Sequence, residues 1–332
     1  MAAVVNPERL LRELHGLWID LGREAEADGG PGVIRACALT LIVMTEDAAG
    51  VAETLAEVMR EHPCRGIVVS VRPDASSVDA RVSAQCWLPL GQKRQICSEQ
   101  IEITTSGPTL GHVYPLLNAL TAPDLPVVVW YRGASLFRSS ELRLPLSMAG
   151  RLILDSGQIE APGAFLRELI EVPHNGLRAG DLAWTRLTCW RDKIAQLFEA
   201  HVCRDGSTGM SEVHILWEGR TARSDVVYMA AWIAEALGWE PQDSRLCVER
   251  ARGAGDGRLL GVRLAAPGMT VAIAREDGGK VAVTLNGMLH EAFFPERSEA
   301  SALTEELSIV ERDAVYEHVL PLAARLVRPG LE

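Results

Sequence analysis

Residues 180–191 bring together the side chains best suited to hold another macromolecule. The segment contains two tryptophans and two arginines in the first turns of an expected long helix. These residue types anchor protein–protein interfaces, because they combine a large contact area with a flat, multi-donor charge. We therefore predict partner contact here, with the candidates Asp181, Trp184, Arg186, Trp190 and Arg191. Packing of the helix against its own core is the alternative, and it suits Trp190 best, since this residue falls on an apolar helical stripe.

Cysteine chemistry is limited to one pair. The chain has seven cysteines, and no two of them form a CxxC motif. A zinc site needs such paired spacing, so none is predicted. Cys86 and Cys97 flank an expected hairpin turn at residues 91–92, which places them opposite each other on antiparallel strands. A reversible disulfide is one outcome and two buried thiols the other, and a reducing cytosol favours the thiols.

The rest of the chain carries no catalytic or cofactor signature. A dinucleotide site needs glycines directly after the first strand of an α/β sheet. Here the glycines of residues 29–32 precede that strand, and Glu46 and Asp47 follow it, where their charge would repel phosphate. A Walker loop, a GxSxG elbow and an HExxH helix are also missing from the sequence. We predict no catalytic, cofactor-binding or metal-binding residues.

Composition narrows the class of protein further. The chain has 332 residues, is 48% hydrophobic and 23% charged, and carries a formal net charge of -11 with a pI near 5.3. An acidic chain lacks the basic footprint of a nucleic-acid binder. Apolar runs such as residues 38–44 fall far short of the roughly 18 residues that span a bilayer, and residues 1–7 do not form a signal peptide. We expect a cytoplasmic protein with no membrane or nucleic-acid partner.

The elements that must position these residues suggest two domains. Residues 33–44, 47–61 and 66–71 follow a strand–helix–strand pattern, which predicts parallel strands. A hairpin over residues 79–105 extends this sheet. The prediction is an N-terminal α/β domain on a mixed sheet, residues 1–174.

The second half follows a different pattern. A helix from Asp181, a strand at residues 213–217 and a helix at residues 224–237 are followed by four strands with an Asp277-Gly278-Gly279 turn. Residues 298–327 are expected to be helical, with Pro321 breaking or bending the helix. We predict a C-terminal α+β domain with an antiparallel meander, residues 175–332.

Six stretches resemble the OpcA family of glucose-6-phosphate dehydrogenase assembly proteins. They follow one another in the expected order and are His62-Pro63-Cys64-Arg65-Gly66-Ile67-Val68-Val69, Ala84-Gln85-Cys86-Trp87, Ile96-Cys97-Ser98-Glu99-Gln100-Ile101, Pro123-Asp124-Leu125-Pro126-Val127-Val128-Val129-Trp130-Tyr131, Arg151-Leu152-Ile153-Leu154-Asp155-Ser156 and Gly180-Asp181-Leu182-Ala183-Trp184-Thr185-Arg186-Leu187. The chain departs from the family at Cys64 and Cys189, where serine and proline are expected.

The resemblance implies a non-catalytic protein that binds glucose-6-phosphate dehydrogenase, promotes its active oligomer and supports the oxidative pentose phosphate pathway. On that basis, Arg186→Glu is expected to weaken the complex and leave the fold intact. Two alternatives stay open: a redox switch at Cys86 and Cys97, and a sugar-phosphate-binding enzyme without familiar motifs.

Overall fold

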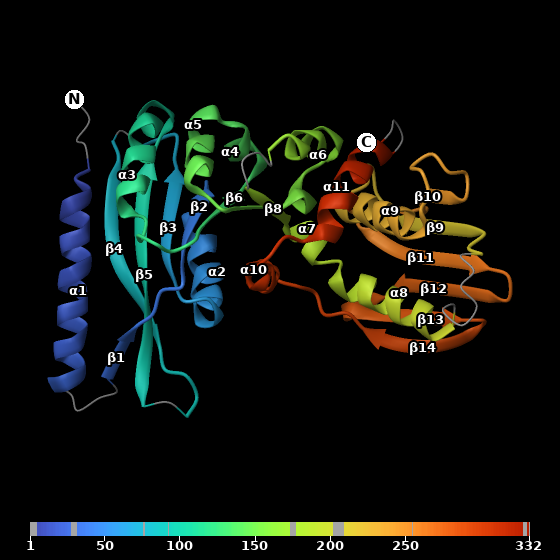
Figure 1. The fold of residues 1–332 in the computed structure, drawn as a ribbon, viewed down its shortest axis with the longest axis horizontal. Coiled ribbons are helices and arrows are strands. Elements are labelled where there is room, and N and C mark those ends of the chain that lie inside the picture. Colours follow the sequence, from blue (N-terminus) through green and yellow to red (C-terminus); the bar gives the residue numbers. More distant parts are fainter. Residues whose placement is uncertain are drawn as a thin grey trace. The chain divides into compact units, whose positions relative to one another are not determined.

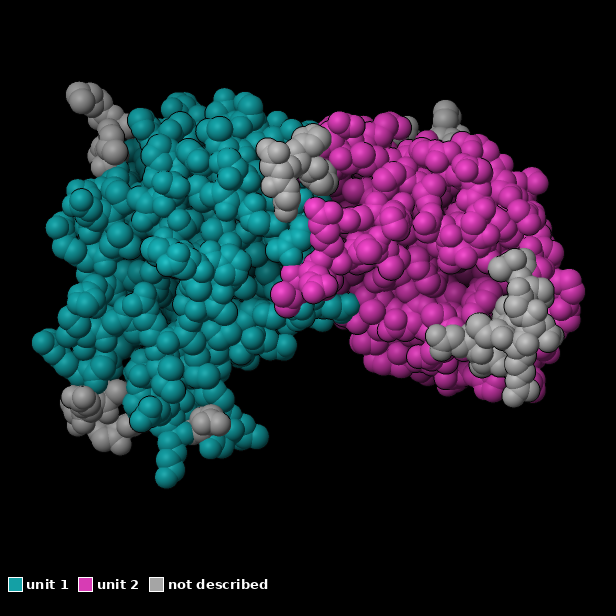
Figure 2. All heavy atoms as spheres, in the orientation of Figure 1, with its two compact units in different colours: residues 1–154, 174–179, 299–308 teal, residues 155–173, 180–298, 309–332 magenta. Residues whose placement is uncertain are grey.

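The chain folds into two compact units, each assembled from several parts of the sequence (Figure 2). The computed structural model describes residues 5–27, 32–75, 77–91, 93–172, 177–201, 209–253, 255–327 and 331. Unit 1 comprises Met1–Leu154, His174–Ala179 and Glu299–Ser308, and unit 2 comprises Asp155–Pro173, Gly180–Ser298 and Ile309–Glu332. The expected boundary between residues 174 and 175 lies outside the described residues, so the division into 1–174 and 175–332 stays a prediction.

Unit 1 is built around the central strand β2 (Leu39–Thr45), which leads through α2 (Ala48–Glu61) to β3 (Cys64–Val71). β2 and β3 pair in parallel, as predicted. All residues of β2 are buried, which is typical of a parallel strand covered on both faces. The expected strand at 33–44 is two strands, because β1 (Gly32–Arg35) pairs with β5 (Arg94–Thr105), whereas β2 pairs with β3.

The sheet of unit 1 has the order β1-β5-β3-β2-β6-β7-β8, with β4 (Asp79–Trp87) beside β5. The strands on the other side of β2 are β6 (Val127–Arg132), β7 (Arg151–Leu154) and β8 (Arg178–Asp181). β2, β6 and β7 run in parallel, whereas β4 and β5 form the expected antiparallel hairpin. From β2 the chain moves outward to β3 and β5 and then returns to β6. This is a doubly wound order with its topological switch point between β2 and β6.

Helices pack on the unit 1 sheet (Figure 1). α1 (Pro7–Ala27) lies against β4 and β1, and α10 (Glu299–Ser308) lies against α2. The other helices of this unit are α3 (Val113–Leu120), α4 (Ala134–Arg138) and α5 (Ser140–Arg143), with the 3-10 turns Gly107–His112 and Leu144–Met148.

Unit 2 contains a six-stranded sheet in the order β10-β9-β11-β12-β13-β14. Its strands are β9 (Glu212–Trp217), β10 (Leu246–Arg250), β11 (Leu259–Ala266), β12 (Met269–Arg275), β13 (Lys280–Leu285) and β14 (Met288–Phe293). β9 and β10 are parallel and every other pair is antiparallel. The turn between β12 and β13 holds Gly278 and Gly279 at positive φ, a conformation that favours glycine. The predicted fold class, α/β followed by α+β with an antiparallel meander, is confirmed.

The helices of unit 2 differ from the expectation in two places. They are α6 (Gly163–Ile170), α7 (Leu182–Thr185), α8 (Thr188–His201), α9 (Ser224–Leu237) and α11 (Ala314–Leu326). The long helix expected from Asp181 is the pair α7 and α8. The expected C-terminal helix is divided at residues 309–313 rather than at Pro321, which lies inside α11. Asp313 begins α11 by accepting a hydrogen bond from the Tyr316 backbone N–H, so a cap decides where this helix starts.

Candidate functional site

The switch point of the unit 1 sheet is occupied by charged side chains of the chain itself. Asp47 begins α2, and its Oδ1 accepts a 3.2 Å hydrogen bond from the Gly50 backbone N–H. Arg132, at the end of β6, donates from Nη1 to Asp47 Oδ2 at 2.9 Å and from Nε to Glu299 Oε2 at 2.9 Å. Thr54 adds a 3.2 Å hydrogen bond to Glu299. In a doubly wound fold a phosphate would approach this helix start, and here a carboxylate holds the position.

The electrostatics keep this arrangement charged at neutral pH. The Arg132 side chain, followed by the Gly50 N–H, lowers the pKa of Asp47. Space is also short, because a Cβ added to Gly50 would lie 2.4 Å from Asp47 Oδ2. The sequence predicted that Glu46 and Asp47 disfavour phosphate at this helix start. For Asp47 the structure adds a geometric reason: its carboxylate occupies the position and is already paired with Arg132.

Asp181 is a buried hydrogen-bond acceptor of unit 2, where β8 ends and α7 begins. Its Oδ1 accepts from the backbone N–H groups of Ser156 at 3.0 Å and Ala183 at 2.9 Å, and its Oδ2 accepts from the Tyr228 hydroxyl at 2.8 Å. The residue is fully buried. Burial, assisted by the nearby Asp155 carboxylate, raises the pKa of Asp181 to about 6.

The two tryptophans of the predicted contact segment also lie inside unit 2. Trp184 is 2% exposed, donates from Nε1 to Asp313 Oδ2 at 2.8 Å and packs against Tyr228 and Tyr316. Trp190 is 3% exposed and packs edge-on against Phe294. For Asp181 and Trp184 the expected surface position is therefore corrected to an interior one, because each satisfies its polar or aromatic contacts within the unit. Trp190 takes the core position that its apolar stripe favoured.

The two arginines are partly accessible but already paired. Arg186 donates to both oxygens of Asp155, at 2.8 and 2.9 Å, and its side chain is 26% exposed. The Arg191 guanidinium lies 3.7 Å from the centroid of the Trp184 ring. Contact with a partner through these arginines stays a prediction, and their internal pairing gives both a structural role in unit 2.

Cys86 and Cys97 lie opposite each other on β4 and β5, as the hairpin geometry predicted. They form a disulfide, which corrects the expectation of two thiols. Cys97 is buried and Cys86 is exposed. Two thiols were expected because a reducing cytosol disfavours disulfides. In the structure the strand register brings the two cysteines together, and they are bonded.

The unit 2 sheet has one face buried under helices and one accessible face. Val213, Ile215 and Trp217 of β9 are buried, and α9 packs against this strand. Alternate residues point the other way, and their register brings Ala274 opposite Ala282. We call this second surface the open face. Its residues are Glu212, His214, Leu216, Cys247, Glu249, Gly261, Arg263, Ala265, Thr270, Ala272, Ala274, Lys280, Ala282, Thr284, Leu289, Glu291 and Phe293.

The open face carries both polar and apolar residues. Charged side chains lie on β9, β10 and β14, as is usual on the solvated face of a sheet. Alanines occupy β12 and β13, and at the edge strand β14 the side chains of Leu289 and Phe293 are each 65% exposed. Exposed large apolar residues beside small ones favour contact with another macromolecule.

Comparison with known proteins decides the family. Residues 55–171 match the family described as the glucose-6-phosphate dehydrogenase subunit N-terminal domain, and residues 178–320 match the corresponding C-terminal domain. The chain belongs to the OpcA family. The predicted resemblance is thereby confirmed.

The OpcA relatives are cyanobacterial. The OxPP cycle protein OpcA of Synechocystis sp. is 27% identical over 199 residues, which cover 59% of this chain and 41% of the relative. The OpcA of Synechococcus elongatus is 27% identical over 191 residues, covering 56% of this chain and 42% of the relative. The match thus extends over about two fifths of the length of these curated relatives.

Solved structures share the fold at very low sequence identity. KijD10, a 3-ketoreductase from Actinomadura kijaniata in complex with NADP and TDP-benzene, superposes with a TM-score of 0.52 at 10% identity, covering 88% of this OpcA chain and 97% of KijD10. This likeness concerns the fold alone. Within the described residues, no helix combines the length and apolar character needed to cross a bilayer.

Proposed function

We propose that this OpcA-family protein is a non-catalytic assembly factor and allosteric activator of glucose-6-phosphate dehydrogenase, acting in the oxidative pentose phosphate pathway. The observation that carries the proposal is the match of both halves of the chain to domains described as glucose-6-phosphate dehydrogenase subunit domains. A protein in this role needs only a higher affinity for the active state of the enzyme than for other states. It needs a complementary surface and no reaction centre.

The switch point of unit 1 supports a binding role over an enzymatic one. Asp47 caps the helix start and is neutralised by Arg132, which Glu299 holds from its other side. A nucleotide or sugar phosphate would have to displace the Asp47 carboxylate and break its ion pair. The second alternative from the sequence, a sugar-phosphate-binding enzyme, is disfavoured by this arrangement.

The open face is our candidate surface for the dehydrogenase. It presents the small side chains of Ala274 and Ala282, and exposed apolar side chains at Leu289 and Phe293. Interfaces gain most of their affinity where such a centre is desolvated on binding. The arginines of the 180–191 segment, by comparison, are engaged within unit 2.

The test mixes the purified protein with the glucose-6-phosphate dehydrogenase of the same organism. We expect the two to co-elute in size-exclusion chromatography, and dehydrogenase activity at subsaturating glucose 6-phosphate to rise. Ala274→Arg should lower the affinity at least about tenfold, because a long charged side chain would be placed in the desolvated centre. Absence of both co-elution and activation by the unmodified chain would exclude the proposed function.

A matched control separates the two candidate surfaces. Ala195→Arg makes the same change at an exposed position of α8 and should leave binding unchanged. If Ala195→Arg weakens the complex and Ala274→Arg does not, the contact lies on the helical side of unit 2 and the open face is excluded.

A redox-responsive switch is the second candidate function, and the Cys86–Cys97 disulfide favours it. Under this hypothesis, reduction of the disulfide changes the β4–β5 hairpin, and the changed hairpin alters the activation of the dehydrogenase. This role adds regulation to the assembly function and does not replace it.

A further inference from the structure

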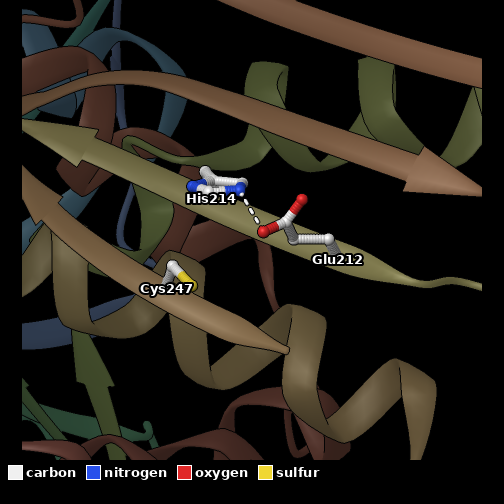
Figure 3. A group of neighbouring side chains, drawn as sticks. All are labelled: Glu212, His214 and Cys247. Atoms are coloured by element: carbon white, nitrogen blue, oxygen red, sulfur yellow. Dashed lines mark ion pairs between the residues drawn. The ribbon is translucent and has the colours of Figure 1, made fainter. Parts of the chain in front are cut away.

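Three side chains capable of metal binding meet at the β9–β10 edge of the open face (Figure 3), and Glu249 lies beside one of them, His214. Glu212 and His214 are two residues apart on β9, so they point to the same face. β10 runs parallel to β9, with Cys247 in register with His214. Glu249 follows two residues after Cys247 and shares its face. Strand pairing therefore fixes the backbone positions of all four residues.

The distances suit a single ion. The ligand atoms of Glu212, His214 and Cys247 all lie within 4.8 Å of one another. In a tetrahedral zinc site with ligand bonds of about 2.0–2.3 Å, neighbouring ligand atoms are roughly 3.4–3.8 Å apart. The widest pair therefore needs to close by about 1.4 Å at most, and the Glu212–His214 contact, at 2.9 Å, needs to open by roughly 0.5 Å. Side-chain rotation can supply both changes while the strands stay in place.

The chemistry of the set favours zinc. Thiolate, imidazole and carboxylate are the three ligand types that Zn²⁺ takes in proteins, and a sulfur ligand disfavours the hard cations Mg²⁺ and Ca²⁺. His214 already has a partner on each ring nitrogen: Glu212 lies 2.9 Å from Nε2 and Glu249 lies 2.9 Å from Nδ1. A carboxylate on Nδ1 is the arrangement that orients a histidine whose Nε2 binds metal.

The local charge also suits a dication. Glu212 and Glu249 place two carboxylates 2.9 Å from the ring nitrogens of His214, beside Cys247, and this local negative charge attracts a cation. Arg263 on β11 lies in register with His214, on the side of β9 away from Cys247.

We propose that Glu212, His214 and Cys247 form a zinc-binding site, with Glu249 positioning His214 through Nδ1. On binding, Zn²⁺ forms bonds to Cys247 Sγ, to the lone pair of His214 Nε2 and to a Glu212 carboxylate oxygen, while the thiol proton and the proton that Nε2 shares with Glu212 leave to solvent. Glu212 exchanges its contact with His214 Nε2 for the metal. Glu212 is half-exposed, so a fourth position can be taken by water.

The test uses the full chain, stripped of metal with a chelator and kept reduced, and does not involve the dehydrogenase. Zn²⁺ is titrated in competition with a chromophoric chelator, and Co²⁺ is added separately as a spectroscopic probe. We expect one zinc per chain and a thiolate-to-cobalt charge-transfer band. Cys247→Ser and His214→Asn should each weaken zinc binding at least about tenfold, and Glu249→Gln by about 10–100-fold as a positioning residue.

Cys189→Ser is the matched control, since it removes a thiol of unit 2 outside the cluster, and it should bind zinc like the unmodified chain. Unfolding midpoints of all variants confirm that each is folded. Three results would overturn the proposal: no stoichiometric zinc, a cobalt complex without the thiolate band, or unchanged affinity in Cys247→Ser. Each leaves the proposed dehydrogenase contact untouched, because that contact is measured by co-elution and activation.

Discussion

Asp181 makes the stability of unit 2 depend on pH. Burial raises its pKa to about 6, above the ordinary value of 3.8. Between these values the folded chain binds more protons than the unfolded chain, so the free energy of unfolding falls as pH rises from about 4 to 6. A shift of this size corresponds to roughly 3 kcal/mol. Asp181→Asn cannot titrate, so its stability relative to the unmodified chain should increase by about that amount from pH 4 to 7.

Urea unfolding at pH 4, 5, 6 and 7, followed by tryptophan fluorescence, measures this difference. Asp192→Asn, at an exposed carboxylate of α8, is the matched control. A stability difference between Asp181→Asn and the unmodified chain that stays constant over this range would show that Asp181 does not titrate there.

Arg186 has a structural role in unit 2, so a substitution at this position does not test partner binding alone. Its substitution by glutamate would remove the bidentate partner of Asp155, whose side chain is 7% exposed, and add a second carboxylate beside it. We expect Arg186→Glu to lower the free energy of unfolding by about 3 kcal/mol and Arg186→Lys to lower it less, as measured by urea unfolding. Equal stability of Arg186→Glu and the unmodified chain would restore the original expectation of an exposed contact residue.

At the scale of elements, the β4–β5 hairpin carries the redox candidate. Its disulfide joins two strands near the turn, so reduction should loosen residues 86–97 and leave β2 and β3 unaffected. Hydrogen exchange of oxidised and reduced protein measures the local effect, and dehydrogenase activation measured under both conditions tests the function. Cys86→Ser should behave like the reduced protein with or without oxidant. Equal activation by the oxidised and reduced forms would exclude the switch.

Helices, strands and turns that are specified by residues within the element itself could be predicted from the sequence. The β2–α2–β3 unit follows from a buried apolar run and a helical stripe, and the β12–β13 turn follows from its glycines. β8 and the break between α7 and α8 were not predicted, because β8 forms through contacts distant in sequence, such as the hydrogen bond from the Arg178 backbone N–H to the Gly150 carbonyl. Tertiary contacts outweighed local propensity there.

The same distinction applies to the candidate sites. The pairing of Cys86 with Cys97 could be predicted because a short hairpin sets the register. The cluster of Glu212, His214 and Cys247 could not, because its ligands meet only through the parallel pairing of β9 with β10, which α9 separates along the chain. A search for closely spaced ligand motifs misses such a site.

At the scale of the whole molecule, the interleaved units have a consequence for biosynthesis. α10 belongs to unit 1, and it supplies Glu306 to the buried Arg151 and Glu299 to Arg132. A nascent chain that has emerged only to residue 174 therefore exposes a sheet whose Arg151 lacks this carboxylate. Unit 1 can mature only after α10 has been synthesised, and a recombinant piece cut at residue 174 would inherit the same defect.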